Sequence, residues 1–252
     1  MGDDDLLEVL GAAVEAVRSA LGTVTDWRPG TERVGQYRID LVADDAALGV
    51  LTAAGLGVLS EESGLHQPNR EVVVVVDPVD GSTNASLGIP WYATSLCAVD
   101  EGGPRVALVV NLATGERFEA VRGGGARRDG VTVRPSGCTD LADAVIGLSG
   151  APAGHGGWRQ YRALGAVALD LCSVACGRLD AYADLTSPSA HGVWDYLAAL
   201  LVCEEAGAVV TDAGGQPLVH LDHGARRSPV AAATPALLDG VVRMWGAGGA
   251  HP

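Results

Sequence analysis

Residues 72–84, VVVVVDPVDGSTN, decide the fold of this chain of 252 residues. The five consecutive valines are too few for a helix and offer no polar face, so they predict a strand buried on both sides. Asp77 and Asp80 follow with Pro78 between them, and the proline prevents a helix from continuing there. Both carboxylates should therefore project from the tip of the strand, where open sheets bind ligands.

Two carboxylates this close would repel each other and raise each other's pKa if nothing neutralised them. A divalent cation is the usual remedy, and a site built only of oxygens favours Mg²⁺ or Mn²⁺ over Zn²⁺. Gly81, Ser82 and Thr83 follow directly, and their backbone N–H groups can hold an anion. Residues 77–84 therefore predict a site for a metal and an anion, with an Asx turn in an acidic loop as the alternative.

Helical patterns precede the valine strand. Apolar residues recur at steps of three and four between Leu6 and Val17, which predicts an opening amphipathic helix. Asp40 stands before the next such pattern as an N-cap would, and that helix should end near Gly55 or Gly57.

The rest of the chain divides into a strand meander and an alternating half. Gly and Asp-Gly turns separate the strands of the meander, whereas a helix with Leu164 and Val167 on its inner face should end near Gly177 in the second half. The predicted elements are strands at 58–59, 93–99, 105–111, 117–121, 131–133, 144–148, 179–183, 209–210 and 230–233, and helices at about 164–177, at 195–205 and from 235.

This order of elements predicts an α+β / α/β architecture of layered helices and sheets. We assign residues 1–140 to an amino-terminal lobe that carries the metal and anion motifs. Residues 141–252 form a carboxyl-terminal α/β lobe, and the two lobes should make one compact unit because no long linker separates them.

The charge balance excludes several classes of partner. Lys and Arg number 17 against 31 Asp and Glu, a formal net charge of −14, which argues against nucleic acid and anionic membranes. No run reaches the roughly 18 apolar residues of a membrane span, and the acidic amino terminus is unlike a signal peptide. Five cysteines without a spacing framework suit buried thiols in a reducing cytoplasm.

Three motifs resemble the signatures of the inositol monophosphatase family, metal-dependent and often lithium-sensitive phosphomonoesterases. They are Ser60-Glu61-Glu62-Ser63, the octapeptide 77–84, and Trp194–Ala199 leading into Glu204–Ala208, in the family's order. The resemblance implies a layered α-β-α-β-α sandwich. It also implies a Mg²⁺-dependent phosphatase that hydrolyses a small polyol or sugar phosphate, such as inositol monophosphate.

The resemblance also implies roles for individual residues. Metal ligation falls to the side chains of four acids and to one backbone carbonyl, which would hold about two or three ions. These ligands are Glu61, Asp77, Asp80, Asp195 and the carbonyl of Val79. Gly81, Ser82 and Thr83 would contact the phosphate, and Glu61 and Ser82 would orient the attacking water. The bland alternatives are an N-cap for Asp195 and a solvated pair with Glu62 for Glu61.

Asp40 resembles the family's aspartate that supports the nucleophilic water. Asp44 in the same stretch is the competing assignment, and an N-cap alone would also explain Asp40.

The substrate segment is similar to that of the family around Gly165, with Asp184 after it. Asp184 stands where inositol-type members carry a longer glutamate, so it reaches less far toward substrate hydroxyls. His191, in a stretch of extra residues, contacts substrate or is a solvated loop histidine. Arg162 binds a second anionic group or is a surface arginine.

Within the enzyme class, histidinol phosphate and adenosine 3′,5′-bisphosphate are the alternative substrates. A metal-binding scaffold that has kept the fold and lost turnover is the alternative outside that class. The expected partners are a small phosphorylated metabolite, as substrate, and a second copy of the chain, because the resemblance implies a homodimer.

Overall fold

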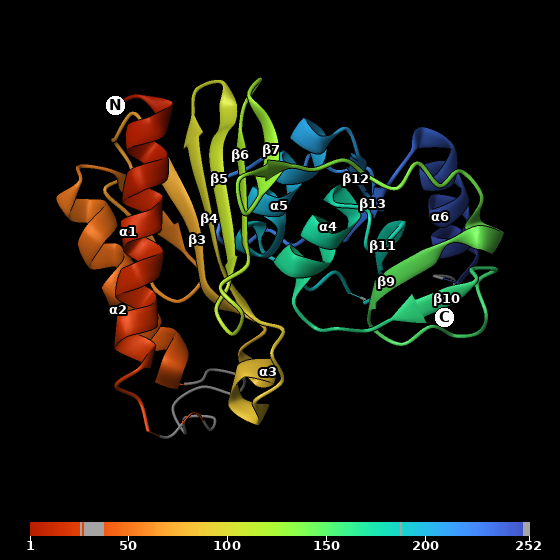
Figure 1. Ribbon diagram of the computed structural model, residues 1–252, viewed down its shortest axis with the longest axis horizontal. Coiled ribbons are helices and arrows are strands. Elements are labelled where there is room, and N and C mark those ends of the chain that lie inside the picture. The colour runs from red at the N-terminus through yellow and green to blue at the C-terminus, as the bar shows by residue number, and fades with distance from the viewer. Residues whose placement is uncertain (26, 28–37, 187, 249–252) are drawn as a thin grey trace.

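The chain folds into alternating layers of helices and sheets (Figure 1). Helices α1 (Asp3–Leu21) and α2 (Arg38–Ala53) cover one face of the first sheet, and α4 (Val167–Ala175) and α5 (Val193–Ala206) fill the space between the two sheets. Helix α6 (Pro235–Gly248) covers the far face of the second sheet. This order confirms the layered α-β-α-β-α sandwich. The computed structural model describes residues 1–25, 27, 38–186 and 188–248.

The first sheet has eight strands in the order β2-β1-β3-β4-β5-β6-β7-β8. Only β1 and β3 pair in parallel; every other neighbouring pair is antiparallel, as a meander requires. The strands are β1 (Gly57–Ser60), β2 (Gly64–His66), β3 (Val73–Asp80), β4 (Ala93–Asp100), β5 (Gly103–Asn111), β6 (Arg117–Val121), β7 (Gly125–Arg128) and β8 (Val131–Thr132).

Strand β3 differs from its prediction in where it ends. All of its residues are buried, as the valine run indicated, but the strand continues through the two aspartates to Asp80. Its register against β4 shifts between Asp77 and Asp80, because Pro78 has no N–H to donate to the ladder. Helix α3 (Ser82–Leu87) follows at once. The aspartates are therefore part of an irregular strand rather than of a turn beyond it.

The second sheet has five strands in the order β10-β9-β11-β13-β12. Strand β9 pairs in parallel with both neighbours, whereas β13 runs antiparallel to β11 and β12. A short 3-10 helix, η1 (Leu141–Asp143), precedes this sheet. The strands are β9 (Val145–Ser149), β10 (Gln160–Arg162), β11 (Ala181–Asp184), β12 (Val209–Asp212) and β13 (Pro229–Ala232).

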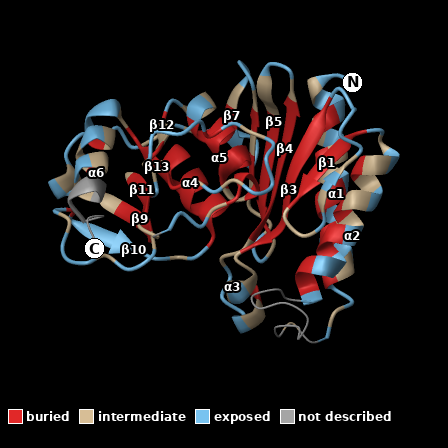
Figure 2. Cartoon of the chain, turned by 180° about the vertical axis from the view of Figure 1, so that it is seen from behind, coloured by how far each residue is buried: buried red, intermediate tan, exposed pale blue. Residues whose placement is uncertain are grey.

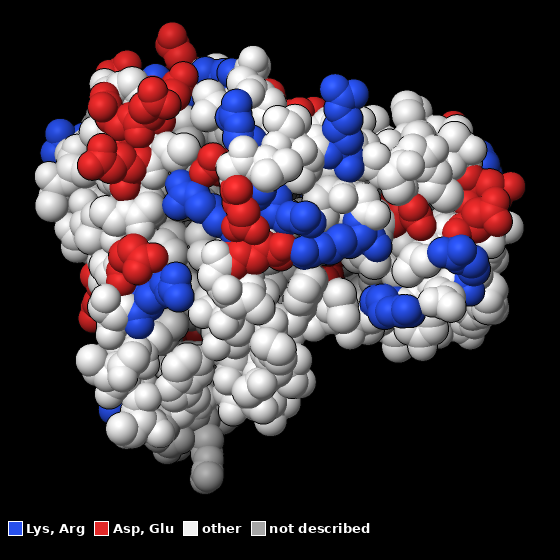
Figure 3. Space-filling view, viewed as in Figure 1, with Lys and Arg blue, Asp and Glu red and all other residues white. Residues whose placement is uncertain are grey.

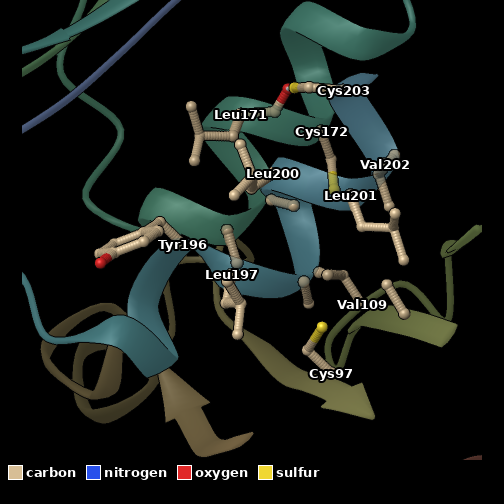
Figure 4. Packing of buried hydrophobic residues seen from close by; sticks show 14 of the residues in the cluster. Cys97, Val109, Leu171, Cys172, Tyr196, Leu197, Leu200, Leu201, Val202 and Cys203 are labelled. Carbon is tan, nitrogen blue, oxygen red and sulfur yellow. Dashed lines mark hydrogen bonds between the residues drawn. The ribbon is translucent and has the colours of Figure 1, made fainter. Parts of the chain in front are cut away.

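The largest core lies around α4 and α5, between the two sheets. Figure 2 shows both helices almost entirely buried. Leu197, Leu200 and Leu201 of α5 pack together with Val109 of the first sheet (Figure 4), and Tyr182 of the second sheet belongs to the same cluster. Because both sheets contribute to this core, α4 and α5 fix the position of one sheet against the other.

Ion pairs mark the surface across the first sheet, where Figure 3 shows basic and acidic side chains interspersed. Arg178, which follows α4, pairs with Glu116 in the turn between β5 and β6, and so connects the two halves of the chain. In the described part of the chain, no helix combines the length and apolar character that a membrane span requires.

Two details of the helix predictions were wrong. Asp40 is not an N-cap: it lies inside the first turn of α2, where its side chain is buried. Leu164 lies outside α4, because this helix begins only at Val167, after the left-handed Gly165 (φ 86°).

Candidate active site

Three carboxylates from distant parts of the sequence meet at one end of the first sheet. Glu61, Asp77 and Asp195 each offer one oxygen, and these oxygens lie within 4.8 Å of one another. These three residues are called the carboxylate group below. Ser60 of β1 pairs in parallel with Val76 of β3, so the residues that follow, Glu61 and Asp77, are neighbours. The parallel pairing of β1 and β3 therefore places two of the three carboxylates side by side.

Helix α5 supplies the third carboxylate from its first turn. Gly192 is the N-cap of α5, and its N–H donates to Asp195 Oδ2 at 2.7 Å. The Ser95 hydroxyl on β4 donates to the carbonyl of Trp194 at 3.2 Å, which ties the start of α5 to the sheet. The N-cap of α5 is therefore Gly192, three residues before Asp195, so the N-cap alternative for Asp195 was wrong. The Asp195 carboxylate accepts the N–H of this N-cap and also lies close to Glu61 and Asp77.

The electrostatics of this group favour the binding of a cation. Burial raises the pKa of Asp77, and the neighbouring Glu61 raises it further. Burial and the charge of Asp195 likewise raise the pKa of Glu61. Among the described residues, only His191 lies within ion-pair distance of any of the three. Like charges this close together are costly at Glu61 and Asp77, which no cationic side chain of the described residues pairs with, and an all-oxygen donor set suits a hard divalent ion, so these residues fit such a metal.

Asp80 is buried beside this group but holds a different position. Its two oxygens accept the N–H groups of Val167 at 3.2 Å and Ala168 at 2.7 Å, at the start of α4. Burial and the charge of Asp195 raise the pKa of Asp80, and the hydrogen bond from Ala168 lowers it. Asp80 therefore connects the carboxylate group to α4, and metal ligation by Asp80 stays a prediction, as does ligation by the Val79 carbonyl.

The predicted anion loop lies against the predicted substrate segment. Gly81 has a left-handed backbone (φ 86°), and a Cβ there would lie 3.0 Å from the carbonyl oxygen of Trp91 and 3.1 Å from that of Gly165. Asn84 of α3 donates its amide to the Leu164 carbonyl at 2.7 Å. The close approach explains why glycine occupies position 81. Ser82 and Thr83 follow as the first residues of α3, so the two segments form one surface.

Asp40 and Asp44 are both buried on α2, but they have different surroundings. Asp44 Oδ1 accepts the Ser60 hydroxyl at 2.5 Å, so this carboxylate anchors the end of β1. The charge of Asp40 contributes to the raised pKa values of both Glu61 and Asp77. Of the two, Asp40 is therefore the residue whose charge acts on Glu61 and Asp77, while its support of a water stays a prediction.

His191 is not a solvated loop histidine, because its side chain is only 14% exposed. Its Nδ1 lies 3.4 Å from Asp195 Oδ2 and its Nε2 lies 3.6 Å from Asp184 Oδ1. Burial lowers the pKa of His191, but the contacts with Asp184 and Asp195 dominate and raise it to about 10. Nothing in the local sequence indicates this burial, which follows from the contacts of His191 with Asp184, Asp195 and the Arg227 backbone.

Asp184 and Arg162 occupy different environments. Asp184 is fully buried at the end of β11, where its Oδ1 accepts the N–H of Thr186 at 2.9 Å and its hydroxyl at 2.6 Å. Burial raises the pKa of Asp184, but contact with His191 lowers it below its usual value. Arg162 lies on the exposed edge strand β10, and its guanidinium donates to Tyr161 and Gln160.

A loop that the sequence analysis did not single out also reaches the site. His223 Nε2 lies 3.0 Å from the carbonyl oxygen of Glu61, which accepts the hydrogen bond. The ring centroid of His223 lies 4.7 Å from that of Trp194, and Arg226 lies 5.1 Å from the same ring. His223 and Arg226 follow Glu61 by more than 160 positions, so no motif or spacing could reveal the contact.

Comparisons with known proteins agree with this geometry. The model of the inositol monophosphatase family matches residues 12–244. An inositol-1-monophosphatase of Mesorhizobium japonicum is 34% identical over 248 residues, with 89% of this chain and 91% of that protein covered. A fructose-1,6-bisphosphatase/inositol-1-monophosphatase of Archaeoglobus fulgidus is 32% identical over 228 residues, covering 86% and 88%. A solved structure, an extragenic suppressor from Pyrococcus furiosus, superposes with a TM-score of 0.83 at 27% identity over 94% of this chain and 99% of that one. The chain therefore belongs to the inositol monophosphatase family of phosphatases.

Proposed function

We propose that this phosphatase is a Mg²⁺-dependent phosphomonoesterase that hydrolyses a small polyol or sugar phosphate, such as inositol monophosphate, with water as the nucleophile. The observation that carries the proposal is the group of Glu61, Asp77 and Asp195, whose ligand oxygens lie within 4.8 Å of one another, with Asp77 buried and the other two half-buried. An anion would meet this group from the adjacent segments around Gly81 and Gly165.

In this proposal Glu61, Asp77, Asp80, Asp195 and the Val79 carbonyl hold the metal, with Mn²⁺ as an alternative ion. Divalent ions in such a site neutralise phosphate charge and lower the pKa of a bound water. The chain contributes the buried carboxylates whose pKa values are raised without a cation. Their mutual repulsion is the free energy that cation binding relieves.

The remaining roles fall to residues around this group. Glu61 and Ser82 orient the attacking water, and Asp40 supports it from the first turn of α2. The backbone of Gly81, Ser82 and Thr83 receives the phosphate at the start of α3. Gly165 and Asp184 face the rest of the substrate, and the burial of Asp184 limits its reach.

A sugar bisphosphate is a second candidate substrate. The Archaeoglobus fulgidus relative is named for both a fructose bisphosphate and an inositol monophosphate, at an identity close to that of the Mesorhizobium japonicum protein. We also propose that the chain acts in the cytoplasm, which its five free cysteines support. Family membership supports a homodimer. Within each copy, residues 1–140 and 141–252 are proposed to be the two lobes of one compact unit.

A panel of phosphomonoesters tests the proposed function. The purified chain is stripped with EDTA, returned to Mg²⁺ and assayed with inositol monophosphate, fructose 1,6-bisphosphate, histidinol phosphate, adenosine 3′,5′-bisphosphate and p-nitrophenyl phosphate. We expect hydrolysis that stops with EDTA and returns with Mg²⁺. Background rates on the whole panel would contradict the enzyme and favour the scaffold.

A single substitution tests the acidic group within that assay. Asp80→Asn should lower kcat at least about 100-fold, because it removes charge beside the group that meets the phosphate. Asp45→Asn is the matched control, since Asp45 is exposed on α2. Wild-type turnover by Asp80→Asn would contradict the assignment of Asp80.

A further inference from the structure

His191 lies between the buried Asp184 and the half-buried Asp195, two acids on different elements. Asp184 ends β11 and Asp195 lies in the first turn of α5, and one imidazole nitrogen faces each carboxylate, at 3.6 Å and 3.4 Å. The backbone of His191 is held as well, because its carbonyl accepts the Arg227 N–H at 2.9 Å. The backbone of His191 is therefore fixed, and its imidazole lies between the end of the second sheet and the carboxylate group.

The contacts of Asp195 divide between its two oxygens. Oδ2 accepts the Gly192 N–H at 2.7 Å and faces His191 Nδ1. Within the described part of the chain, Oδ1 carries no such anchor. Asp195 nevertheless keeps one oxygen within 4.8 Å of those of Glu61 and Asp77, despite the repulsion between these acids. Oδ2 is thus held, whereas Oδ1 makes no hydrogen bond with the residues that the structure describes.

Asp184 is held on its own side by the Thr186 hydroxyl and N–H. It is fully buried, and its Oδ1 lies 3.6 Å from His191 Nε2, at ion-pair rather than hydrogen-bond distance. Contacts therefore run from Asp184 through His191 to Asp195, which belongs to the carboxylate group. Such partners behind a ligating side chain orient it, and their loss typically weakens metal binding.

We propose that His191 is a positioning residue, which orients the Asp195 carboxylate for the divalent cation through Nδ1 while Asp184 and the Arg227 backbone hold the imidazole in place. This inference rests on the proposed function, because it requires Asp195 to bind the metal. It gives Asp184 a second role, the support of His191, beside the limited substrate contact proposed above. The role does not depend on contact between His191 and substrate.

Three substitutions separate the two nitrogens of the imidazole. Asn can place its amide where Nδ1 lies, whereas Gln places its amide where Nε2 lies. His191→Ala should weaken Mg²⁺ binding about 10- to 100-fold, measured by calorimetric titration of the stripped protein without substrate. His191→Asn should restore most of this affinity, and His191→Gln should not. In turnover, kcat should fall at a fixed Mg²⁺ concentration while KM for the phosphomonoester changes little.

His155→Ala is the matched control, because His155 is exposed in the loop before β10. Equal Mg²⁺ affinity in wild type and His191→Ala would overturn the inference alone, as would a His191→Asn variant no better than His191→Gln. If His191→Ala does not fold, the ranking of the Asn and Gln variants makes the same test. A wild-type protein that takes up no Mg²⁺ would overturn the proposed function itself and this inference with it.

Discussion

Replacing Asp77 by Asn should make the metal-free protein more stable and at the same time abolish its activity. Asp77 is 2% exposed, and its ligand oxygen lies within 4.8 Å of those of Glu61 and Asp195. Asn keeps the shape of the side chain and can still accept the Val79 N–H, which Asp77 Oδ1 receives at 3.0 Å. The substitution therefore removes charge from the group with little change in packing.

The size of the effect follows from Coulomb's law. Two unit charges at most 4.8 Å apart repel each other by at least about 3.5 kcal/mol at an effective dielectric constant of about 20. Proton uptake relieves part of this repulsion, since burial and the neighbouring Glu61 raise the pKa of Asp77. We therefore expect Asp77→Asn to raise the free energy of unfolding by about 2–4 kcal/mol near pH 8.

The pH dependence has a definite sign. A carboxyl whose pKa is raised by folding keeps its proton in the folded chain at pH values where the unfolded chain has lost it. Stability then falls as the pH rises above the unfolded pKa, so the advantage of Asn is larger near pH 8 than near pH 5. Mg²⁺ should narrow the difference, because wild type gains about 2.7 kcal/mol at a concentration of 100 times Kd and the variant gains less.

Urea unfolding in EDTA and in Mg²⁺ measures both parts. Asp45→Asn, which removes one exposed negative charge from α2, should leave both midpoints within experimental error of wild type. An Asp77→Asn protein that is less stable than wild type in EDTA would refute the reasoning. That result would mean that the charged acids stabilise the fold even when no cation is bound.

Two further predictions concern residues around the carboxylate group. Gly81→Ala should cost about 1–3 kcal/mol for its left-handed backbone and more for the 3.0 Å approach to Trp91, and it should weaken inhibition by inorganic phosphate. Gly55→Ala is the control in urea unfolding, because Gly55 has φ +83° and nothing near its Cβ; equal losses would contradict the close approach. Asp170→Asn should be neutral near pH 4 and stabilising near pH 8, by at most about 4 kcal/mol, because burial raises the pKa of Asp170 to about 7 and an Asn still accepts the Trp91 N–H. A difference from wild type that does not change with pH would contradict it.

The sequence predicted the layers and most strands because their signals are local. The valine run of β3 and the helical spacing in α1 report burial directly, and the structure agrees with both. Strands β7 and β10 gave no such signal, since β7 is short and begins at a glycine and all residues of β10 are exposed. Local patterns also misplaced Asp40 by relying on its residue type, which is as common at an N-cap as in a first turn.

The candidate site shows the same division. Glu61, Asp77 and Asp195 were found from motifs, and the parallel pairing of β1 and β3 explains why two of them meet. The surroundings of His191 and the contact of His223 with Glu61 depend on how loops pack across the molecule. Spacing along the chain carries no information about such contacts, so the sequence alone left His191 open and missed His223.

The layer of α4 and α5 has a consequence for the chemistry of the cysteines. Cys172 of α4 and Cys203 of α5 are buried in this layer together with Cys97 of β4, which packs against it, and the Cys203 thiol donates to the Leu171 carbonyl at 3.2 Å (Figure 4). Burial raises the pKa of all three thiols. Because oxidants and alkylating agents react with the thiolate, these side chains stay inert as long as the sheets remain closed over them. Oxidative damage to this core would therefore begin with a separation of the two sheets.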